Sequence, residues 1–457
     1  MSDSNANPFR LPSEQQGIRD KCFHPTGAFV EFPREDLETS VAERFEKIVR
    51  LLPERIAIET DGRLVTYSEL NAMANRVAHR IVAERGTAPE PVALLIDKGI
   101  EQIAAMLGIL KAGKFFVPID PSYPLERMSS VVQDSQTALL IVDRRNFSTA
   151  KQITGSDCQL SALEAMLSSN QTENLCVSVL PTAFACLIYT AGSTGKPKGV
   201  IRDHRGVLHG AMLRVHSDGV SSNDRLGHIT AGTANAITNS FYVLLHGATL
   251  VAFDVGQEGV TRLASWVVDA KITICLIASP LFRKLCAALT GNEKFPNLRY
   301  LRLRSDTVYQ SDVDLFKRYF PPTCLLANGL ALSETGPLRE YQIGRDTDFP
   351  GPEVPVGYAL EDKEVLLVDD NGNEVATNEI GQIVVRGKYL AAGYWNNSQL
   401  HEAKFKRDPQ DPEKRLFYTG DLGLILPDGC LIHKGRKDSR IKIRGYGVDL
   451  LEVEKAL

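Results

Sequence analysis

The stretch Leu187–Val200, "LIYTAGSTGKPKGV", is the most informative segment of the chain. Apolar and aromatic residues lead into it, as expected for a buried strand that ends near Tyr189. Gly192 and Gly195 then allow unusual backbone dihedral angles, which turn amide N–H groups toward one point. The same loop adds hydroxyl and ammonium groups at Thr190, Ser193, Thr194, Lys196 and Lys198. The segment therefore predicts a loop that holds a polyphosphate.

The loop differs from the Walker phosphate-binding pattern. That pattern requires Ser or Thr directly after its lysine, whereas Pro197 follows Lys196 here. Proline also stiffens the turn between the two lysines. The plain alternative is a solvated polar turn with two surface lysines.

Composition limits the class of protein. The chain has 457 residues, enough for two or three domains or subdomains, with 43% hydrophobic and 24% charged residues. A net charge of −4 and an isoelectric point near 6.2 give no footprint for nucleic acid or an anionic membrane. No apolar run approaches the roughly 20 residues that span a bilayer. The polar N-terminus and eight cysteines without a CxxC pair favour a cytoplasmic protein with free thiols.

Apolar runs alternate with helical patterns from Asp36 onward. Thr66 and Glu69 have capping-box spacing ahead of one helix, and Gly113 ends another. The runs themselves read as buried strands: 91–97, 115–120, 137–143, 185–190, 248–254, 272–279 and 324–330. This alternation predicts a layered α/β core with mostly parallel sheets flanked by helices.

The texture changes after about Gly351. The segment "KEVLLVDDNGNEV" (363–375) predicts a hairpin of strand, Asp-Asn-Gly turn and strand. Further short antiparallel units follow, and together they predict a smaller β-rich subdomain. We expect four parts: a tail or packing strap (1–35), α/β subdomains (36–350), the β-rich subdomain (351–437), and a hinge with the start of a C-terminal lid (438–457).

Six motifs in order link the chain to a known family. Besides the loop they are "LVTYSEL" (64–70), "LKAGKFFVPIDPSYP" (110–124), "GQIVVRGKYLAAGYWNNSQL" (381–400), "FYTGDLG" (417–423) and "GRKDSRIKIRGYGVDLLEVE" (435–454). Together they resemble the adenylate-forming superfamily, and the second motif and "YWNN" favour the adenylation domains of nonribosomal peptide synthetases. The resemblance covers roughly residues 36–457.

The resemblance implies a site for ATP and Mg²⁺. The residues expected to contact ATP are Thr190, Ser193, Thr194, Gly195, Lys198, Asn328, Leu330, Ser333, Thr335, Asp421 and Arg436. Lys198, Glu334 and Thr335 are the expected catalytic residues, with Glu334 as the magnesium ligand because Mg²⁺ prefers oxygen. Leu330 stands where the family usually has an aromatic ring beside adenine. The plain alternatives are a solvent-facing Glu334 in a turn and a turn-capping Asp421.

The same resemblance places a hinge at Asp438. The family's catalytic lid lysine lies in a later motif that does not follow Leu457. We therefore expect the chain as given to bind ATP and acid but to adenylate poorly, either because it is a fragment or because another domain interrupts the parent protein.

The acyl pocket departs from the amino-acid-activating pattern. Two alignments of "GHITAGTANAITNSFYVLLHGATL" (227–250) put Ala234 or Asn235 where the family has an aspartate for the substrate ammonium. A buried ammonium without an anion is costly, so we expect a keto, hydroxy, aryl or other acid instead. A β-amino acid held by another carboxylate stays open, and Asn235 has the alternative of capping a helix.

Further pocket residues follow by matching position. The expected set is Ala234, Asn235, Thr238, Ile277, Arg302, Arg304, Gly329, Pro337 and Leu338. Arg302 and Arg304 share one face of a predicted strand. If that face meets the substrate, we expect a second carboxylate or another polar acceptor on the acid; if it meets solvent or Asp/Glu neighbours, the arginines carry no specificity.

The sequence thus predicts ATP-dependent activation of a carboxylic acid to an acyl-AMP, for transfer to the phosphopantetheine thiol of a carrier protein. The alternatives are a stand-alone acyl-CoA ligase and a degenerate adenylation-like binding module that does not catalyse.

Overall fold

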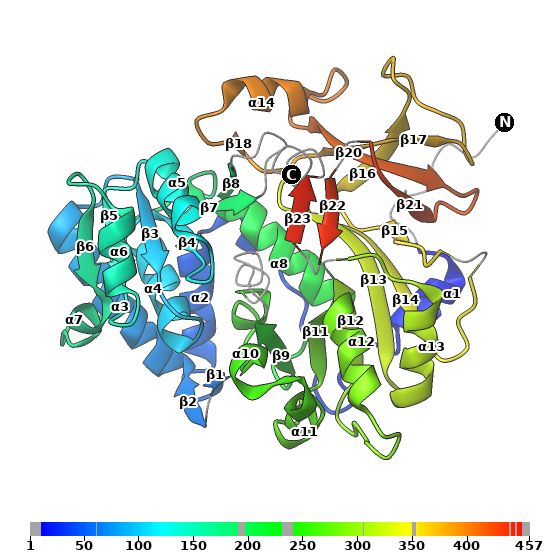
Figure 1. Ribbon diagram of the computed structural model, residues 1–457, viewed down its shortest axis with the longest axis horizontal. Coiled ribbons are helices and arrows are strands. Elements are labelled where there is room, and N and C mark those ends of the chain that lie inside the picture. The colour runs from blue at the N-terminus through cyan, green and yellow to red at the C-terminus, as the bar shows by residue number, and fades with distance from the viewer. Residues whose placement is uncertain are drawn as a thin grey trace.

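The computed structural model describes residues 11–60, 62–190, 197–230, 241–304, 306–349 and 353–437, and the backbone of two strands at 440–443 and 446–449. Within that part it contains three larger sheets and a small hairpin (Figure 1). The predicted α/β class with mostly parallel sheets is confirmed.

The first sheet has seven strands in the order β18-β8-β7-β4-β3-β5-β6. Its strands are β3 (Pro91–Leu95), β4 (Phe115–Ile119), β5 (Leu139–Val142), β6 (Gln159–Ala162), β7 (Phe184–Thr190), β8 (Lys198–Asp203) and β18 (Gly393–Tyr394). The strands β3 to β7 are parallel to their neighbours, while β8 returns antiparallel to β7. The parallel strands are continuous apolar runs because both faces are buried.

The second sheet has nine strands in the order β15-β14-β13-β12-β11-β9-β10-β1-β2. They are β1 (Ile56–Thr60), β2 (Arg63–Thr66), β9 (Arg225–Thr230), β10 (Thr249–Asp254), β11 (Ile274–Ala278), β12 (Tyr300–Arg304), β13 (Leu325–Leu332), β14 (Gly336–Ile343) and β15 (Tyr358–Ala359). The central strands β9 to β13 are parallel, so their carboxyl ends meet at one edge.

The third sheet is antiparallel and comes from the β-rich segment. It contains β16 (Lys363–Val368), β17 (Ile380–Gly387), β19 (Phe405–Arg407), β20 (Arg415–Ile425) and β21 (Leu431–Arg436), and β22 (Arg440–Ile443) pairs with β23 (Tyr446–Asp449) outside it. The predicted hairpin across 363–375 is reduced to an isolated bridge between Val368 and Glu374. The strand that pairs with β16 is β17 instead.

Helices pack on both faces of the two parallel sheets. They are α1 (Ser13–Arg19), α2 (Val41–Leu51), α3 (Tyr67–Arg85), α4 (Ile100–Lys111), α5 (Leu125–Ser135), α6 (Phe147–Ile153), α7 (Leu163–Leu167), α8 (His204–Asp218), α10 (Val255–Glu258), α11 (Leu263–Asp269), α12 (Ser279–Ala288), α13 (Gln310–Tyr319) and α14 (Ser398–Lys404), with short 3₁₀ turns at Arg34–Glu38 and Val260–Arg262. The capping box predicted for Thr66 and Glu69 opens α3. Gly113 follows α4 with φ at +75°, as its stop position requires.

The helix α8 lies between the two parallel sheets (Figure 1). The central core around it joins Leu94 and Phe116 of the first sheet to Ile274 and Tyr300 of the second. The helices α11 to α13 cover the opposite face of the nine-stranded sheet. One face of the nine-stranded sheet therefore packs toward α8. The carboxyl edge of this sheet lies close to the β7–β8 hairpin, because Glu334, just after β13, contacts Lys198 at the start of β8.

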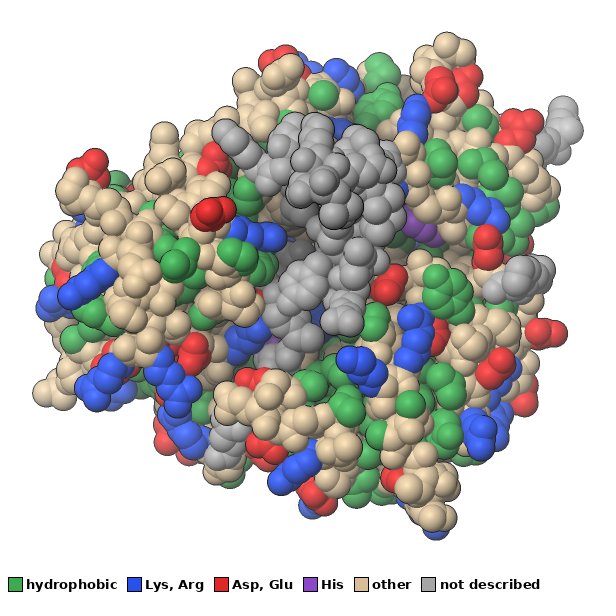
Figure 2. All heavy atoms as spheres, in the orientation of Figure 1, with side chains coloured by type: hydrophobic (Ala, Val, Ile, Leu, Met, Phe, Trp, Pro, Cys, Tyr) green, Lys and Arg blue, Asp and Glu red, His purple; other side chains and the backbone are tan. Residues whose placement is uncertain are grey.

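The surface matches the balanced composition. Basic and acidic side chains are intermixed over the face in Figure 2. Among the residues that the structure describes, no helix is both long and apolar enough to cross a membrane.

Candidate active site

The predicted phosphate loop connects two paired strands. Thr190 ends β7 and pairs across the hairpin with Lys198, the first residue of β8. The loop returns as a strand, unlike a Walker loop, which opens a helix. The buried Thr190 hydroxyl has no hydrogen-bond partner among the described residues. Ser193, Thr194 and Gly195 lie outside the described residues.

Lys198, Glu334 and Tyr394 form a compact polar cluster. The Lys198 Nζ lies 2.6 Å from Glu334 Oε1 and donates to the Tyr394 hydroxyl at 3.1 Å. That hydroxyl donates to the same Glu334 oxygen at 2.7 Å. The ammonium also lies 4.7 Å from the centre of the Tyr394 ring. Burial opposes ionisation of Glu334, but Lys198 and the two hydrogen bonds outweigh it and hold its pKa below the usual range.

The backbone around Glu334 is fixed by three other parts of the chain. The carbonyl of Ser333 accepts from Arg202 at 3.3 Å, and that of Glu334 accepts from the Ala391 amide at 2.8 Å. The carbonyl of Thr335 accepts from the fully buried Lys363. These bonds tie the turn between β13 and β14 to β8, β16 and the segment before β18.

Thr335 lies on the same chain segment as Asn328 and Leu330, which are also predicted to contact ATP. Thr335 is fully buried, and its hydroxyl donates to the Gly336 carbonyl at 3.0 Å. The Asn328 amide donates to the carbonyls of Val354 and Pro355, at 3.3 and 2.8 Å, so it also fixes a neighbouring loop. Leu330 packs against the core beneath the antiparallel sheet.

Gly329 has a structural reason to be glycine. An added Cβ would lie 2.6 Å from the Arg339 carbonyl oxygen on β14. Further along β14, Pro337 and Leu338 are buried, and Leu338 packs with Val200 of β8.

Asp421 and Arg436, predicted as ribose contacts, are neighbours across β20 and β21. The buried Asp421 carboxylate forms an ion pair with the Arg436 guanidinium. The other carboxylate oxygen lies 3.9 Å from His433 Nε2. The predicted hinge residue, Asp438, lies outside the described residues.

The register of the nine-stranded sheet divides the predicted pocket residues. Arg302 and Arg304 pair with Leu276 and Ala278 of β11, so these four residues share the face toward α8. Ile277 is fully buried on the opposite face, among α11 to α13. The register therefore separates Ile277 from the arginines and puts Leu276 on their face. Ala234, Asn235 and Thr238 lie outside the described residues.

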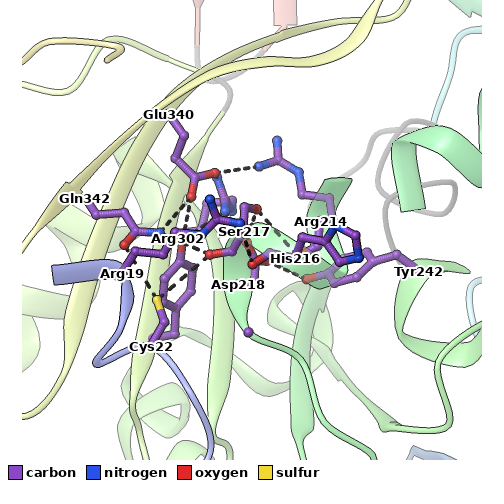
Figure 3. A network of polar contacts seen from close by, with 12 residues as sticks. Arg19, Cys22, Arg214, His216, Ser217, Asp218, Tyr242, Arg302, Glu340 and Gln342 are labelled. Atoms are coloured by element: carbon purple, nitrogen blue, oxygen red, sulfur yellow. Dashed lines mark hydrogen bonds and ion pairs between the residues drawn. The ribbon is translucent and has the colours of Figure 1, made fainter. Parts of the chain in front are cut away.

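Arg302 is already paired with carboxylates (Figure 3). It lies between Asp218 at the end of α8 and Glu340 of β14, with 2.7 Å from its Nη1 to the Glu340 carboxylate. The sequence left two interpretations open for Arg302: contact with the substrate, or pairing with acidic neighbours. The structure supports pairing with acidic neighbours. Arg304, two residues later, has no such partner among the described residues.

Sequence reasoning missed three residues of this site. Tyr394 stands within the quoted motif 381–400, so the motif was a signal for it. Arg202 and Lys363 carry no sequence signal beyond a charge within a strand, since their roles depend on contacts with a distant turn.

Comparisons with known proteins identify the family of the chain. A family model described as AMP-binding enzyme matches residues 45–395. The chain is 32% identical over 427 residues to tyrocidine synthase 2 of Brevibacillus parabrevis and 31% identical over 426 residues to surfactin synthase subunit 2 of Bacillus subtilis. Each alignment covers 92% of this chain but only 11% and 12% of the respective synthase, so the chain spans about a tenth of the length of these relatives.

Solved structures share the fold. An artificially fused adenylation–PCP di-domain, NpsA-ThdA from Klebsiella oxytoca, superposes with a TM-score of 0.81 at 22% identity, over 92% of this chain and 83% of that one. The N-terminal subdomain of NpsA, in complex with 3-hydroxybenzoyl-AMSN, superposes with a TM-score of 0.76 at 21% identity, over 87% of this chain and 98% of that one. The chain therefore belongs to the AMP-binding enzymes, as an adenylation domain of the nonribosomal peptide synthetase type within the adenylate-forming superfamily.

Proposed function

We propose that this chain activates a carboxylic acid with ATP and passes the acyl group to a carrier protein. A carboxylate oxygen of the acid attacks the α-phosphorus of ATP, and the bond to the bridging oxygen breaks to release pyrophosphate. The phosphopantetheine thiol of the carrier then attacks the acyl carbon, AMP leaves, and the thiol proton passes to solvent. The carrier is proposed by analogy with the adenylation–PCP di-domain relative.

The single observation that carries the proposal is the cluster of Lys198, Glu334 and Tyr394 at the mouth of the phosphate-loop hairpin. A lysine that is nearly buried is poised to neutralise phosphate charge in a site with little water. When the triphosphate enters, Lys198 exchanges its carboxylate partner for phosphate oxygens. The unpaired Thr190 hydroxyl supplies a further donor to the same ligand.

Glu334 suits a magnesium ion. Its carboxylate stays ionised, since its pKa is held low by Lys198 and Tyr394 against the effect of burial. No cluster of three or more potential metal-ligating side chains occurs in the described ranges. That fits Mg²⁺, which is commonly held by one or two carboxylates together with substrate phosphates. When bound, the ion would neutralise charge on the leaving pyrophosphate, while Glu334 orients it.

Asp421 is assigned to the ribose. One carboxylate oxygen is held by Arg436, which fixes the carboxylate in place. Such a carboxylate accepts hydrogen bonds from the two ribose hydroxyls. Arg436 is positioned to add a contact to ribose or phosphate.

The acid is proposed to lack a standard α-ammonium group. This part rests on the sequence at Ala234 and Asn235, neither of which is acidic. An ammonium group transferred there from water would lack an anionic partner.

The test combines equilibrium binding with turnover. Calorimetry measures ATP binding to the 457-residue chain. Acid-dependent pyrophosphate exchange is followed in a form that carries the complete lid, with a panel of amino, hydroxy, keto, aryl and dicarboxylic acids. Exchange with non-amino acids supports the proposal. Activity with ordinary L-amino acids only would contradict the proposal that the acid lacks an α-ammonium group. Absence of both exchange and ATP binding would indicate a binding module instead of an enzyme.

A further inference from the structure

We propose that the activated acid carries a second carboxylate and that Arg304 is the residue that pairs with it. This inference rests on the proposed function, because it names the substrate class of that same site.

Arg304 lies where a ligand of this fold is expected. It is the last residue of β12, at the carboxyl edge of the parallel strands β9 to β13. Open parallel sheets bind ligands at this edge. The neighbouring strand, β13, runs from the same edge into the turn that holds Glu334. Arg304 therefore lies on the same edge as the chemistry, on the face toward α8.

The acidic groups on that face are already committed to other partners. Asp218 accepts from Arg302 and, at 3.1 Å, from the Tyr242 hydroxyl. Glu340 is paired with Arg302 and with Arg214, whose Nη1 lies 3.1 Å away. Figure 3 shows these side chains converging from α8, β12 and β14. Glu340 is thus held by two arginines, and Asp218 by Arg302 together with the hydroxyls of Tyr242 and Ser217, so neither carboxylate is left for Arg304.

Arg304 is consequently a partly buried cation without a carboxylate. No hydrogen bond or ion pair joins its guanidinium to another side chain in the part of the chain that the structure describes. Burial lowers its pKa to about 10, with Arg214 and Arg302 nearby adding to the effect. The sequence 231–240, "AGTANAITNS", which lies outside the described residues, contains no acidic residue.

Two other basic side chains near Arg304 add no uncompensated charge. His228 of β9 is buried, and its pKa is lowered to about 3 by burial, with Arg304 and Lys98 contributing. His228 is therefore neutral at physiological pH and offers a hydrogen bond without a charge. The Lys98 ammonium lies 3.5 Å from Asp120, so it is balanced within the protein. The local excess of one cation is that of Arg304.

A carboxylate is the ligand that best satisfies this group. A guanidinium presents two parallel N–H donors, which match the two oxygens of a carboxylate. Pairing also removes the cost of a cation held away from water without an anion. Since one carboxylate of the substrate must react with ATP, the partner of Arg304 is a second one.

The decisive comparison uses a dicarboxylic acid and its monoamide, which have the same shape but differ in one charge. Each is offered as the acyl part of a non-hydrolysable acyl-sulfamoyl adenosine analogue, and calorimetry measures its dissociation constant. Several spacer lengths, both aliphatic and aromatic, are included. We expect the carboxylate member of at least one pair to bind more than about tenfold tighter.

The variants are Arg304→Gln, Arg304→Lys and, as a matched control, Arg262→Gln at an exposed arginine. The carboxylate-to-amide preference should fall to about one in Arg304→Gln, stay partly intact in Arg304→Lys and be unchanged in Arg262→Gln. Separate measurement of ATP binding checks that each variant is folded. No preference in the unmodified chain, or a preference that survives Arg304→Gln, would overturn the inference. Failure of every analogue and of ATP to bind would instead count against the proposed function.

Discussion

Replacing Lys198 with methionine tests the electrostatics of the proposed site. The substitution keeps much of the side chain's apolar length but removes the ammonium that lies 2.6 Å from Glu334. The two side chains are only 14% and 9% exposed, so solvent does little to compensate the carboxylate that remains. Breaking a buried pair costs about 3–5 kcal/mol. Because Tyr394 still donates to Glu334, we expect the free energy of unfolding to fall by about 3 kcal/mol at pH 7.5.

The loss should depend on pH in a defined direction. In the unmodified protein, burial would raise the pKa of Glu334, but Lys198 chiefly outweighs burial and holds the pKa low. The ionised Glu334 therefore stabilises the fold at pH values above its ordinary pKa. That contribution to the free energy of unfolding is lost as pH falls through the lowered pKa. Without Lys198, burial dominates and the pKa of Glu334 rises. At pH values between these two pKa values, the Glu334 carboxyl is protonated in the variant but ionised in the unmodified protein. The difference in unfolding free energy should therefore shrink by about 1.4 kcal/mol per unit as pH falls through that window.

The assay is thermal unfolding of both proteins between pH 4.5 and 8. We expect the variant's midpoint to be lower by about 5 °C at pH 7.5, with the gap narrowing toward acid. The control is the double variant Lys198→Met with Glu334→Gln, which removes both charges and should recover most of the loss. ATP affinity should stay more than about tenfold weaker in both variants. A gap that does not change with pH, or a double variant as unstable as the single one, would refute the reasoning.

Three further outcomes are expected. Asp421→Ala should weaken ATP binding by more than about tenfold in calorimetry, because the ribose loses its proposed acceptor; equal affinity would remove the assignment. Arg302→Met should lower the free energy of unfolding by about 3–5 kcal/mol in denaturant titration, because two buried carboxylates lose a common partner; a cost under 1 kcal/mol would show that they do not depend on it. Gly329→Ala should lower the thermal midpoint by a few degrees, since its Cβ would lie 2.6 Å from the Arg339 carbonyl oxygen, whereas an unchanged midpoint would mean that β14 yields freely.

The layered fold was predictable because buried parallel strands are written as continuous apolar runs. The run at 137–143 corresponds to Leu139–Val142, for example, and the capping box at Thr66 marks a helix start. The chain reversal expected across 363–375 is present, with an antiparallel bridge between Val368 and Glu374, but the long partner of β16 is β17. A turn signal predicts a reversal and not which strand becomes the main partner.

The candidate site was predictable residue by residue but not as a set of contacts. Lys198 and Glu334 are 136 positions apart, and only the folded chain brings them together. Nothing in the sequence indicates the role of Lys363, because that role depends on its contact with the Thr335 carbonyl, which only the folded chain brings close. Ile277 illustrates another limit: a shift of one position along a strand moves a side chain to the other face, and matching by position does not resolve that step.

The pairing of Arg302 with Asp218 and Glu340 has a consequence for recombining such enzymes. The strands β9 to β12, which carry Arg302 and Arg304, lie in one continuous segment of the chain, of the kind that a chimera would exchange to change the acid. The charges that balance Arg302 lie on either side of that segment, on α8 and β14. A donor segment with a neutral residue at position 302 would leave Asp218 without its arginine and Glu340 with Arg214 alone. A successful graft must therefore bring Asp218 and Glu340 with the strands or neutralise them in the host.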